Sequence, residues 1–143
     1  MTDEYDYLAG IKPRIYLAGP MENVNEEEGN AWRQEVTLLL AKQDLQAINP
    51  YYLEQERNRP KFLVKTDLRA ILHCEGMIIN ASQDVVTWGT PMEVLWAHMH
   101  RVINVAFTGS IHSHPSPWLL NHAEIVSTPE QAVEVMAWKI QRL

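Results

Sequence analysis

The chain has 143 residues, of which 46% are hydrophobic and 21% charged, a composition that fits one compact globular domain and excludes a disordered or collagen-like chain. Its 12 Lys and Arg against 18 Asp and Glu give a net charge of −6, so it lacks the basic surface that a nucleic-acid polymer requires. The single cysteine, Cys74, excludes an internal disulfide and a zinc site built from several thiolates.

The sequence also indicates where the protein resides. Its longest apolar runs, such as residues 102–107, are far shorter than the roughly 20 residues that cross a bilayer. The first ten residues, MTDEYDYLAG, lack the basic and apolar regions of a signal peptide. We therefore expect a soluble, cytoplasmic protein with one domain over residues 1–143, in which residues 1–12 are a candidate for a flexible extension.

Short apolar runs alternate with longer amphipathic segments, which is typical of a parallel sheet covered by helices on both faces. In chain order, the expected strands are residues 14–18, 45–49, 76–80, 102–107 and 124–126. The expected helices are residues 27–42, 62–74, 91–100 and 118–122, and a last helix that begins with a capping box formed by Thr128 and Gln131. Residues 51–60 are expected to form a long loop. The pattern predicts an α/β fold with a doubly wound, five-stranded parallel sheet.

Candidate site residues should lie at one edge of this sheet. Doubly wound sheets bind ligands beyond the carboxyl ends of their strands, so the loops after Ala18, Asn80 and Phe107 should share one rim. Asn80 and Gln83, at the end of the third strand, are polar candidates for contacts with a ligand.

Two carboxylates and a tyrosine are the candidates for chemistry. Glu93 follows Gly89 and Thr90 and is expected in the first turn of its helix, where the positive end of the helix dipole favours an ionised carboxylate. Asp67 lies on the preceding helix, and Tyr16 lies in the first strand. Each also has a structural interpretation: Glu93 as a complement to the dipole, Asp67 as an exposed helix carboxylate and Tyr16 as a core residue.

Three segments, IYLAGPM (residues 15–21), KTDLRAILHCEGMIIN (65–80) and GTPMEVLWA (89–97), occur in the order found in a known family. They resemble the nucleoside 2-deoxyribosyltransferases and their nucleotide N-glycosidase relatives. The resemblance implies a flavodoxin-like fold, a homo-oligomer with shared active sites, and cleavage of the N-glycosidic bond between a base and a deoxyribose. It implies no metal and no organic cofactor.

Carried onto this chain, the resemblance implies that Glu93 attacks the anomeric carbon and forms a glycosyl-enzyme intermediate. It makes Asp67 the residue that binds the sugar or manages protons at the departing base, and Tyr16 the hydroxyl that orients Glu93. A retaining displacement needs such a division of tasks between two carboxylates. Gly19 would let the backbone approach the ligand closely.

The chain departs from the family pattern at two substrate-binding positions. Thr87 stands where the transferases often have an aspartate, and Asp84 lies three residues upstream. Where the transferases present an asparagine from a neighbouring subunit, this chain offers Ser116. Small hydroxyl residues at these places help hold a 5′-phosphate in the hydrolase branch, so Thr87 and Ser116 favour a monophosphate substrate.

The first loop favours the opposite conclusion, because its segment ENVNEEEGN would repel a phosphate dianion. Its four carboxylates are Glu22, Glu26, Glu27 and Glu28. Three basic side chains could compensate for these carboxylates, but each is expected to be a solvated helix charge instead; they are Arg33, Lys65 and Arg69. The sequence leaves the choice between a free nucleoside and a nucleotide open.

A histidine-rich loop contains a possible metal motif. His112 and His114 form an HxH pair near His122, but a third ligand at defined spacing is missing, so loop histidines are the preferred interpretation. Trp88 and Trp118 are expected to pack, or to wall the pocket.

Taken together, the residues and the resemblance predict an enzyme that cleaves a 2′-deoxynucleoside or deoxynucleotide through Glu93 and transfers deoxyribose to another nucleobase. A 2′-deoxynucleoside 5′-monophosphate N-hydrolase, in which water is the acceptor, is the alternative. A noncatalytic nucleotide-binding module is the alternative from another class. The expected partners are a deoxynucleoside or deoxynucleotide and a free base, with no nucleic-acid polymer and no membrane.

Overall fold

The fold is described here from a computed structural model over residues 12–53, 60–83, 85, 87–109 and 115–143. Its strands are β1 (Arg14–Ala18), β2 (Gln46–Ile48), β3 (Gly76–Asn80), β4 (Ile103–Phe107) and β5 (Glu124–Val126). Its helices are α2 (Glu26–Lys42), α3 (Pro50–Leu53), α4 (Pro60–Leu72), α5 (Gly89–Met99), α6 (Pro117–His122) and α7 (Pro129–Ile140). The proposed flexible extension lies, except for Lys12, outside the described residues.

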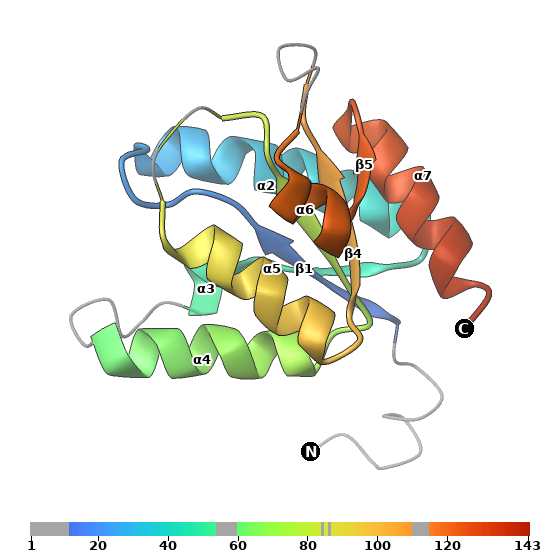
Figure 1. Cartoon of the computed structure of the whole chain (residues 1–143). Coiled ribbons are helices and arrows are strands. Elements are labelled where there is room, and N and C mark those ends of the chain that lie inside the picture. The colour runs from blue at the N-terminus through green and yellow to red at the C-terminus, as the bar shows by residue number, and fades with distance from the viewer. Residues whose placement is uncertain (1–11, 54–59, 84, 86, 110–114) are drawn as a thin grey trace.

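The five strands form one sheet in the order β2-β1-β3-β4-β5, and every neighbouring pair is parallel (Figure 1). This is the flavodoxin-like strand order, in which the chain reverses its direction of progress between β1 and β3. The fold class predicted from the sequence is therefore confirmed. Ligands of this fold bind beyond the carboxyl ends of the strands at that reversal. The loops that follow β1 and β3 begin there.

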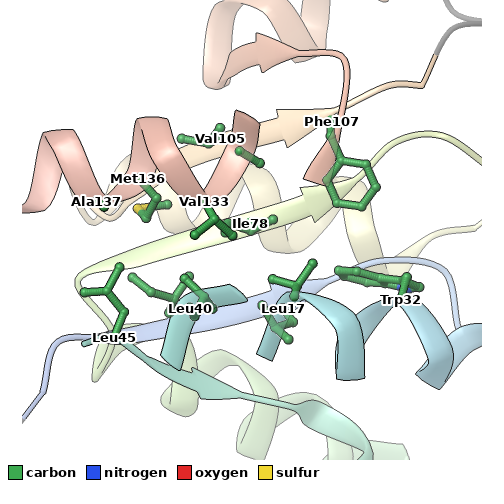
Figure 2. Packing of buried hydrophobic residues seen from close by; sticks show 13 residues of the cluster. Leu17, Trp32, Leu40, Leu45, Ile78, Val105, Phe107, Val133, Met136 and Ala137 are labelled. Atoms are coloured by element: carbon green, nitrogen blue, oxygen red, sulfur yellow. The ribbon is translucent and has the colours of Figure 1, made fainter. Parts of the chain in front are cut away.

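Helices cover both faces of the sheet, and the strand residues alternate between the two faces. Ile15 and Leu17 pack in the cluster under α2 and α7, part of which Figure 2 shows. Tyr16 and Ala18 point to the opposite face and pack in the cluster under α4 and α5. Because side chains along a strand alternate, β1 contributes equally to both halves of the core.

Helix starts follow local capping chemistry. The Asn25 side chain accepts a hydrogen bond from the Glu28 amide at the start of α2, and the predicted capping box of Thr128 and Gln131 is present at α7. The expected loop at residues 51–60 is wrong at both ends, because Pro50–Leu53 forms the single turn α3 and α4 begins at Pro60. The Asn49 side chain accepts from the Tyr51 amide there, which satisfies one of the free donors of this turn.

None of the helices in the described part of the chain combines the length and the apolar character that crossing a bilayer requires.

Candidate active site

A tyrosine hydroxyl and a carboxylate from distant parts of the chain meet on the face of the sheet that α4 and α5 cover. Tyr16 lies in the middle of β1 and is fully buried, and its hydroxyl donates a hydrogen bond of 2.6 Å to Oε2 of Glu93 in α5. Glu93 is only partly buried, so its carboxylate reaches from the core toward solvent. A short bond from a hydroxyl to a carboxylate fixes the carboxylate in one orientation.

The expected position of Glu93 in the first helical turn is wrong. Helix α5 begins at Gly89 rather than at residue 91, so Glu93 is its fifth residue and the first turn contains no acidic side chain. The influence of the helix dipole falls off within the first turn. The Tyr16 hydroxyl, rather than the helix end, therefore supplies a local hydrogen bond to this carboxylate.

Asp67 belongs to the same cluster. It is partly buried in α4, and one of its carboxylate oxygens is shielded from solvent. Burial raises the pKa of Tyr16 well above its ordinary value, and the nearby charges of Glu93 and then Asp67 raise it further. Tyr16 therefore stays protonated and keeps its proton available as a hydrogen-bond donor.

The two carboxylate-bearing helices are tied together next to the site. The Trp96 indole nitrogen of α5 donates to the Leu68 carbonyl of α4 at 3.0 Å, one residue after Asp67. On the sheet side, the buried Asn104 amide of β4 donates to the Val94 carbonyl at 3.1 Å, one residue after Glu93. These bonds hold both helices at defined heights over the sheet.

A cavity of about 490 Å³ opens over this cluster, and we call it the Glu93 cavity. It lies between the loop after β1, helix α4 and the start of α5. Its lining residues are Gly19, Met21, Glu22, Val24, Glu26, Tyr51, Leu63, Val64, Asp67, Leu68, Thr87, Gly89, Thr90, Met92 and Glu93. Its volume falls within the range of small-molecule sites.

Gly19 forms the part of the cavity wall where the chain leaves β1. A Cβ atom at this position would lie 2.6 Å from the Trp32 ring and 3.3 Å from Cβ of Asn80. Only glycine therefore fits between the indole and the end of β3, which agrees with the close approach of backbone expected at this position.

Arg33 is not the solvated helix charge that its place in the sequence suggests; it is completely buried. Its guanidinium donates to the Leu17 carbonyl at 3.2 Å, to the Gly19 carbonyl at 2.9 Å and to the Gly29 carbonyl. It also lies against the rings of Trp32 and Tyr51, with its central carbon 4.6 and 5.1 Å from the two ring centroids. Arg33 of α2 thus bonds to the end of β1 and to Gly19 in the cavity wall.

The Glu93 cavity is acidic. Among its described lining residues, four carry carboxylates and none is Lys or Arg; the four are Glu22, Glu26, Asp67 and Glu93. Glu27 and Glu28 of the same acidic segment are exposed and do not line it.

A second cavity, of about 430 Å³, lies on the other side of α5, between the loop after β3 and α6; we call it the Ser116 cavity. Asn80, Gln83 and Ser116 line this cavity and not the Glu93 cavity. Thr87 and Thr90 line both. Within one chain the predicted site residues are therefore divided between two neighbouring cavities, and Asp84 lies outside the described residues.

Two of the remaining candidates, His122 and Trp118, line this second cavity. His122 lines it and its ring lies 4.6 Å from that of His98, whereas His112 and His114 lie outside the described residues. No group of three or more His, Cys, Asp or Glu side chains in the described ranges is arranged to hold a metal ion. Trp118 lines the Ser116 cavity but is strongly exposed, and the exposed Trp88 lines neither cavity.

Sequence reasoning missed Arg33 and Tyr51 as parts of the site. Tyr51 lines the Glu93 cavity from α3, a one-turn helix too short to leave a periodic pattern. Arg33 follows the buried Trp32 and lies on the buried side of α2. Its position in the helical pattern of apolar residues was the signal that could have predicted its burial.

The fold and the site define the class of protein: a flavodoxin-like α/β domain with a tyrosine-bound glutamate at the reversal of the sheet. No protein-family model matches the sequence, and no curated protein shows significant sequence similarity to it. Solved structures do share the fold. The predicted resemblance to deoxyribosyltransferases and N-glycosidases is confirmed at this level.

Three of these structures illustrate the range of the fold. A conserved protein from Enterococcus faecalis V583 has a TM-score of 0.69 and 15% identity, with 93% of this chain and 100% of that one covered. A 2-deoxyribosyltransferase from Bacillus psychrosaccharolyticus has a TM-score of 0.68 and 16% identity, with 84% and 90% covered. A CMP N-glycosidase from Clostridium botulinum has a TM-score of 0.56 and 16% identity, with 86% and 97% covered.

Proposed function

We propose that this protein cleaves the N-glycosidic bond of a 2′-deoxynucleoside in the Glu93 cavity and transfers the deoxyribose to another nucleobase. The observation that carries the proposal is the 2.6 Å hydrogen bond from the buried Tyr16 to Glu93, which lines a cavity large enough for a nucleoside. Two fold neighbours are described as a 2-deoxyribosyltransferase and a CMP N-glycosidase, which supports chemistry at a glycosidic bond.

In the proposed reaction the Glu93 carboxylate attacks C1′ on the face opposite the base. The C1′–N bond breaks, its electron pair goes to the base nitrogen, and a proton supplied at Asp67 neutralises the departing base. A nitrogen of the second base then attacks C1′ and gives up its proton to Asp67, the ester to Glu93 breaks, and both carboxyl groups return to their starting protonation states. Two displacements at one carbon retain its configuration.

The acidic lining favours a substrate without a 5′-phosphate. A dianion in this cavity would be close to four carboxylates, and the guanidinium of Arg33 beneath the wall is directed at backbone carbonyls. Repulsion between like charges in a partly desolvated site lowers the affinity of that site for a phosphate dianion. We therefore propose the free deoxynucleoside as the donor and the 5′-monophosphate as the poorer substrate.

The test is to incubate the protein with deoxynucleosides and, separately, deoxynucleoside 5′-monophosphates, with and without a free acceptor base, and to separate the products by chromatography. We expect a new deoxynucleoside only when the acceptor is present. Glu93→Gln should abolish the product and also the deoxyribosyl adduct detected by mass spectrometry of acid-quenched protein. The matched control is Glu134→Gln, the same chemical change on the opposite face of the sheet, which should leave turnover within about twofold of the starting protein.

The outcomes separate the alternatives. Free deoxyribose with or without an acceptor base would identify a hydrolase, and cleavage confined to monophosphates would refute the argument from the acidic lining. Binding of nucleosides without any product would identify a noncatalytic module. Turnover that survives Glu93→Gln unchanged would remove Glu93 from the mechanism.

A further inference from the structure

Among its described lining residues, the Glu93 cavity contains one aromatic side chain, Tyr51 of α3. Helix α3 follows the edge strand β2 and packs against β1 and α4 (Figure 1). Tyr51 is only partly buried, so part of its ring is accessible from the cavity. Purine and pyrimidine bases bind to proteins by stacking on such rings. The position of this ring therefore decides whether a base can stack on it.

A buried cation holds the Tyr51 ring in place. The central carbon of the Arg33 guanidinium lies over the ring, 5.1 Å from its centroid. Arg33 is itself fixed, because it is completely buried and donates hydrogen bonds to three backbone carbonyls. A desolvated guanidinium attracts an aromatic face, so the ring has one orientation before any ligand binds. The face of the ring opposite to Arg33 is then the one that a ligand can cover.

A glycine of α2 makes room for the hydroxyl end of the same ring. A Cβ atom at Gly29 would lie 3.2 Å from Cζ of Tyr51 and would collide with the Tyr51 hydroxyl. Gly29 is buried and does not line the Glu93 cavity. Tyr51 thus occupies a slot between the Arg33 side chain and the backbone of α2, and this slot requires a residue without a side chain at position 29.

The strand order places Tyr51 and Glu93 on the two sides of β1. Strand β1 lies between β2 and β3. Tyr51 comes three residues after Ile48, the last residue of β2, whereas Glu93 belongs to α5, the helix after β3. In the proposed reaction Glu93 attacks C1′ on the face opposite the base, so the base points away from Glu93. The direction away from Glu93 across β1 leads to Tyr51.

We propose that Tyr51 is the base-stacking residue of the Glu93 cavity, and that the purine or pyrimidine ring of the nucleoside lies on the face of Tyr51 opposite to Arg33. This inference rests on the proposed function, because that function places a nucleoside in this cavity. Stacking holds the base equally well before and during cleavage of the glycosidic bond. Tyr51 therefore determines how tightly a base binds, whereas Tyr16 acts on the rate.

The test measures binding by calorimetry with each of the four common deoxynucleosides and their free bases, on protein that carries Glu93→Gln so that no substrate is consumed. Tyr51→Leu should raise the Kd of the ligands that bind by about 5- to 150-fold, the range that stacking on one aromatic ring contributes. Tyr51→Phe keeps the ring and should stay within about threefold. The matched control is Trp138→Leu on α7, because Trp138 also has an arginine over its ring but lies outside the Glu93 cavity.

A second pair of variants tests the position of the ring. Gly29→Ala should displace the ring and raise the Kd at least about fivefold, although it changes no residue that lines the cavity. Adding Tyr51→Phe removes the hydroxyl that the new Cβ meets, so the double variant should recover most of the lost affinity. A purely structural role of Tyr51 would not produce this recovery. Alanine is favoured over glycine inside a helix, so Gly29→Ala should fold, and circular dichroism checks each variant.

In the active protein, Tyr51→Leu should raise KM by the same factor as Kd and leave kcat within about threefold. A Kd that Tyr51→Leu leaves within about twofold would overturn the proposal, and so would equal losses in Tyr51→Leu and Trp138→Leu or a starting protein that binds no nucleoside and no base. If the double variant recovers no affinity, the stated position of the ring is wrong.

These results separate the stacking role from the proposed activity. Calorimetry needs no turnover, so ligands that bind through Tyr51 without forming a product would refute the transferase and leave the stacking role intact. Turnover with a KM that Tyr51→Leu does not change would refute the stacking role and leave the transferase intact.

Discussion

Replacing Tyr16 by Phe tests the proposed chemistry with the smallest change the structure offers. The substitution keeps the buried ring and removes the hydroxyl that donates 2.6 Å to Glu93. A hydrogen bond to a charged group contributes about 1.5–3 kcal/mol. If this bond holds the carboxylate for attack, its loss lowers kcat/KM by about 10- to 150-fold, at 1.4 kcal/mol for each factor of ten.

The kinetic parameter that changes is as informative as the size of the change. Tyr16 is not among the residues that line the Glu93 cavity, so the loss should fall on kcat and leave KM within about threefold. Initial rates measured over a range of deoxynucleoside concentrations separate the two. A Tyr16→Phe protein that folds and keeps kcat within about twofold would refute the orienting role of the hydroxyl, as would a change confined to KM.

Three further predictions concern stability, each measured by urea denaturation. Arg33→Met leaves three buried carbonyls without their charged donor and should lower the free energy of unfolding by about 3 kcal/mol; a loss below about 1 kcal/mol would contradict the bonding described. Gly19→Ala, whose new Cβ would meet the Trp32 ring, should cost about 1–3 kcal/mol, whereas Gly89→Ala, with no atom within 4 Å, should be neutral or stabilising; equal effects would refute the steric argument. Burial, with the nearby charge of Glu75, raises the pKa of the Cys74 thiol to about 12 from an ordinary 9.0. Between these two pH values the thiol ionises in the unfolded chain but not in the folded one. The free energy of unfolding should therefore fall by about 1.4 kcal/mol per pH unit over this range. Cys74→Ala should reduce the slope by about 1.4 kcal/mol per pH unit between pH 9.0 and about 12, while the raised pKa of Tyr16 still contributes a slope above about pH 10.0 in the variant. A slope that the substitution leaves unchanged would assign it to groups other than Cys74.

The sequence predicts the central strands well because of where they lie. The expected bounds of β1 and β3 match the structure and those of β4 differ by one residue, since buried parallel strands appear as nearly uninterrupted apolar runs. The expected bounds of the edge strand β5 match as well, although its residues are exposed or only partly buried. The edge strand β2 is shorter than expected, Gln46–Ile48 instead of residues 45–49. Its first expected residue, Leu45, instead donates its amide to the Leu40 carbonyl and closes the end of α2.

The site was less accessible to sequence reasoning than the fold. The structure brings Glu93 and Asp67 together around Tyr16, as their family-like segments suggested, although their catalytic roles stay predictions. Periodicity indicates which face of an element is buried, but it does not indicate which side of α5 a loop residue such as Ser116 will reach. The helical pattern of α2 places Arg33 on its buried side, but it does not indicate that the carbonyls of Leu17 and Gly19, from the end of β1, accept hydrogen bonds from the guanidinium.

Tyr16 packs in the buried core and also donates a hydrogen bond to Glu93, so a substitution at this position would affect both the stability of the fold and the orientation of the carboxylate. Laboratory evolution toward altered base preference should therefore leave it untouched and draw its useful changes from the cavity rim, where Leu63 and Val64 of α4 have no part in the buried clusters. The architecture thus separates the Tyr16–Glu93 pair from the edge of the cavity, and a library restricted to that edge should change selectivity without loss of expression.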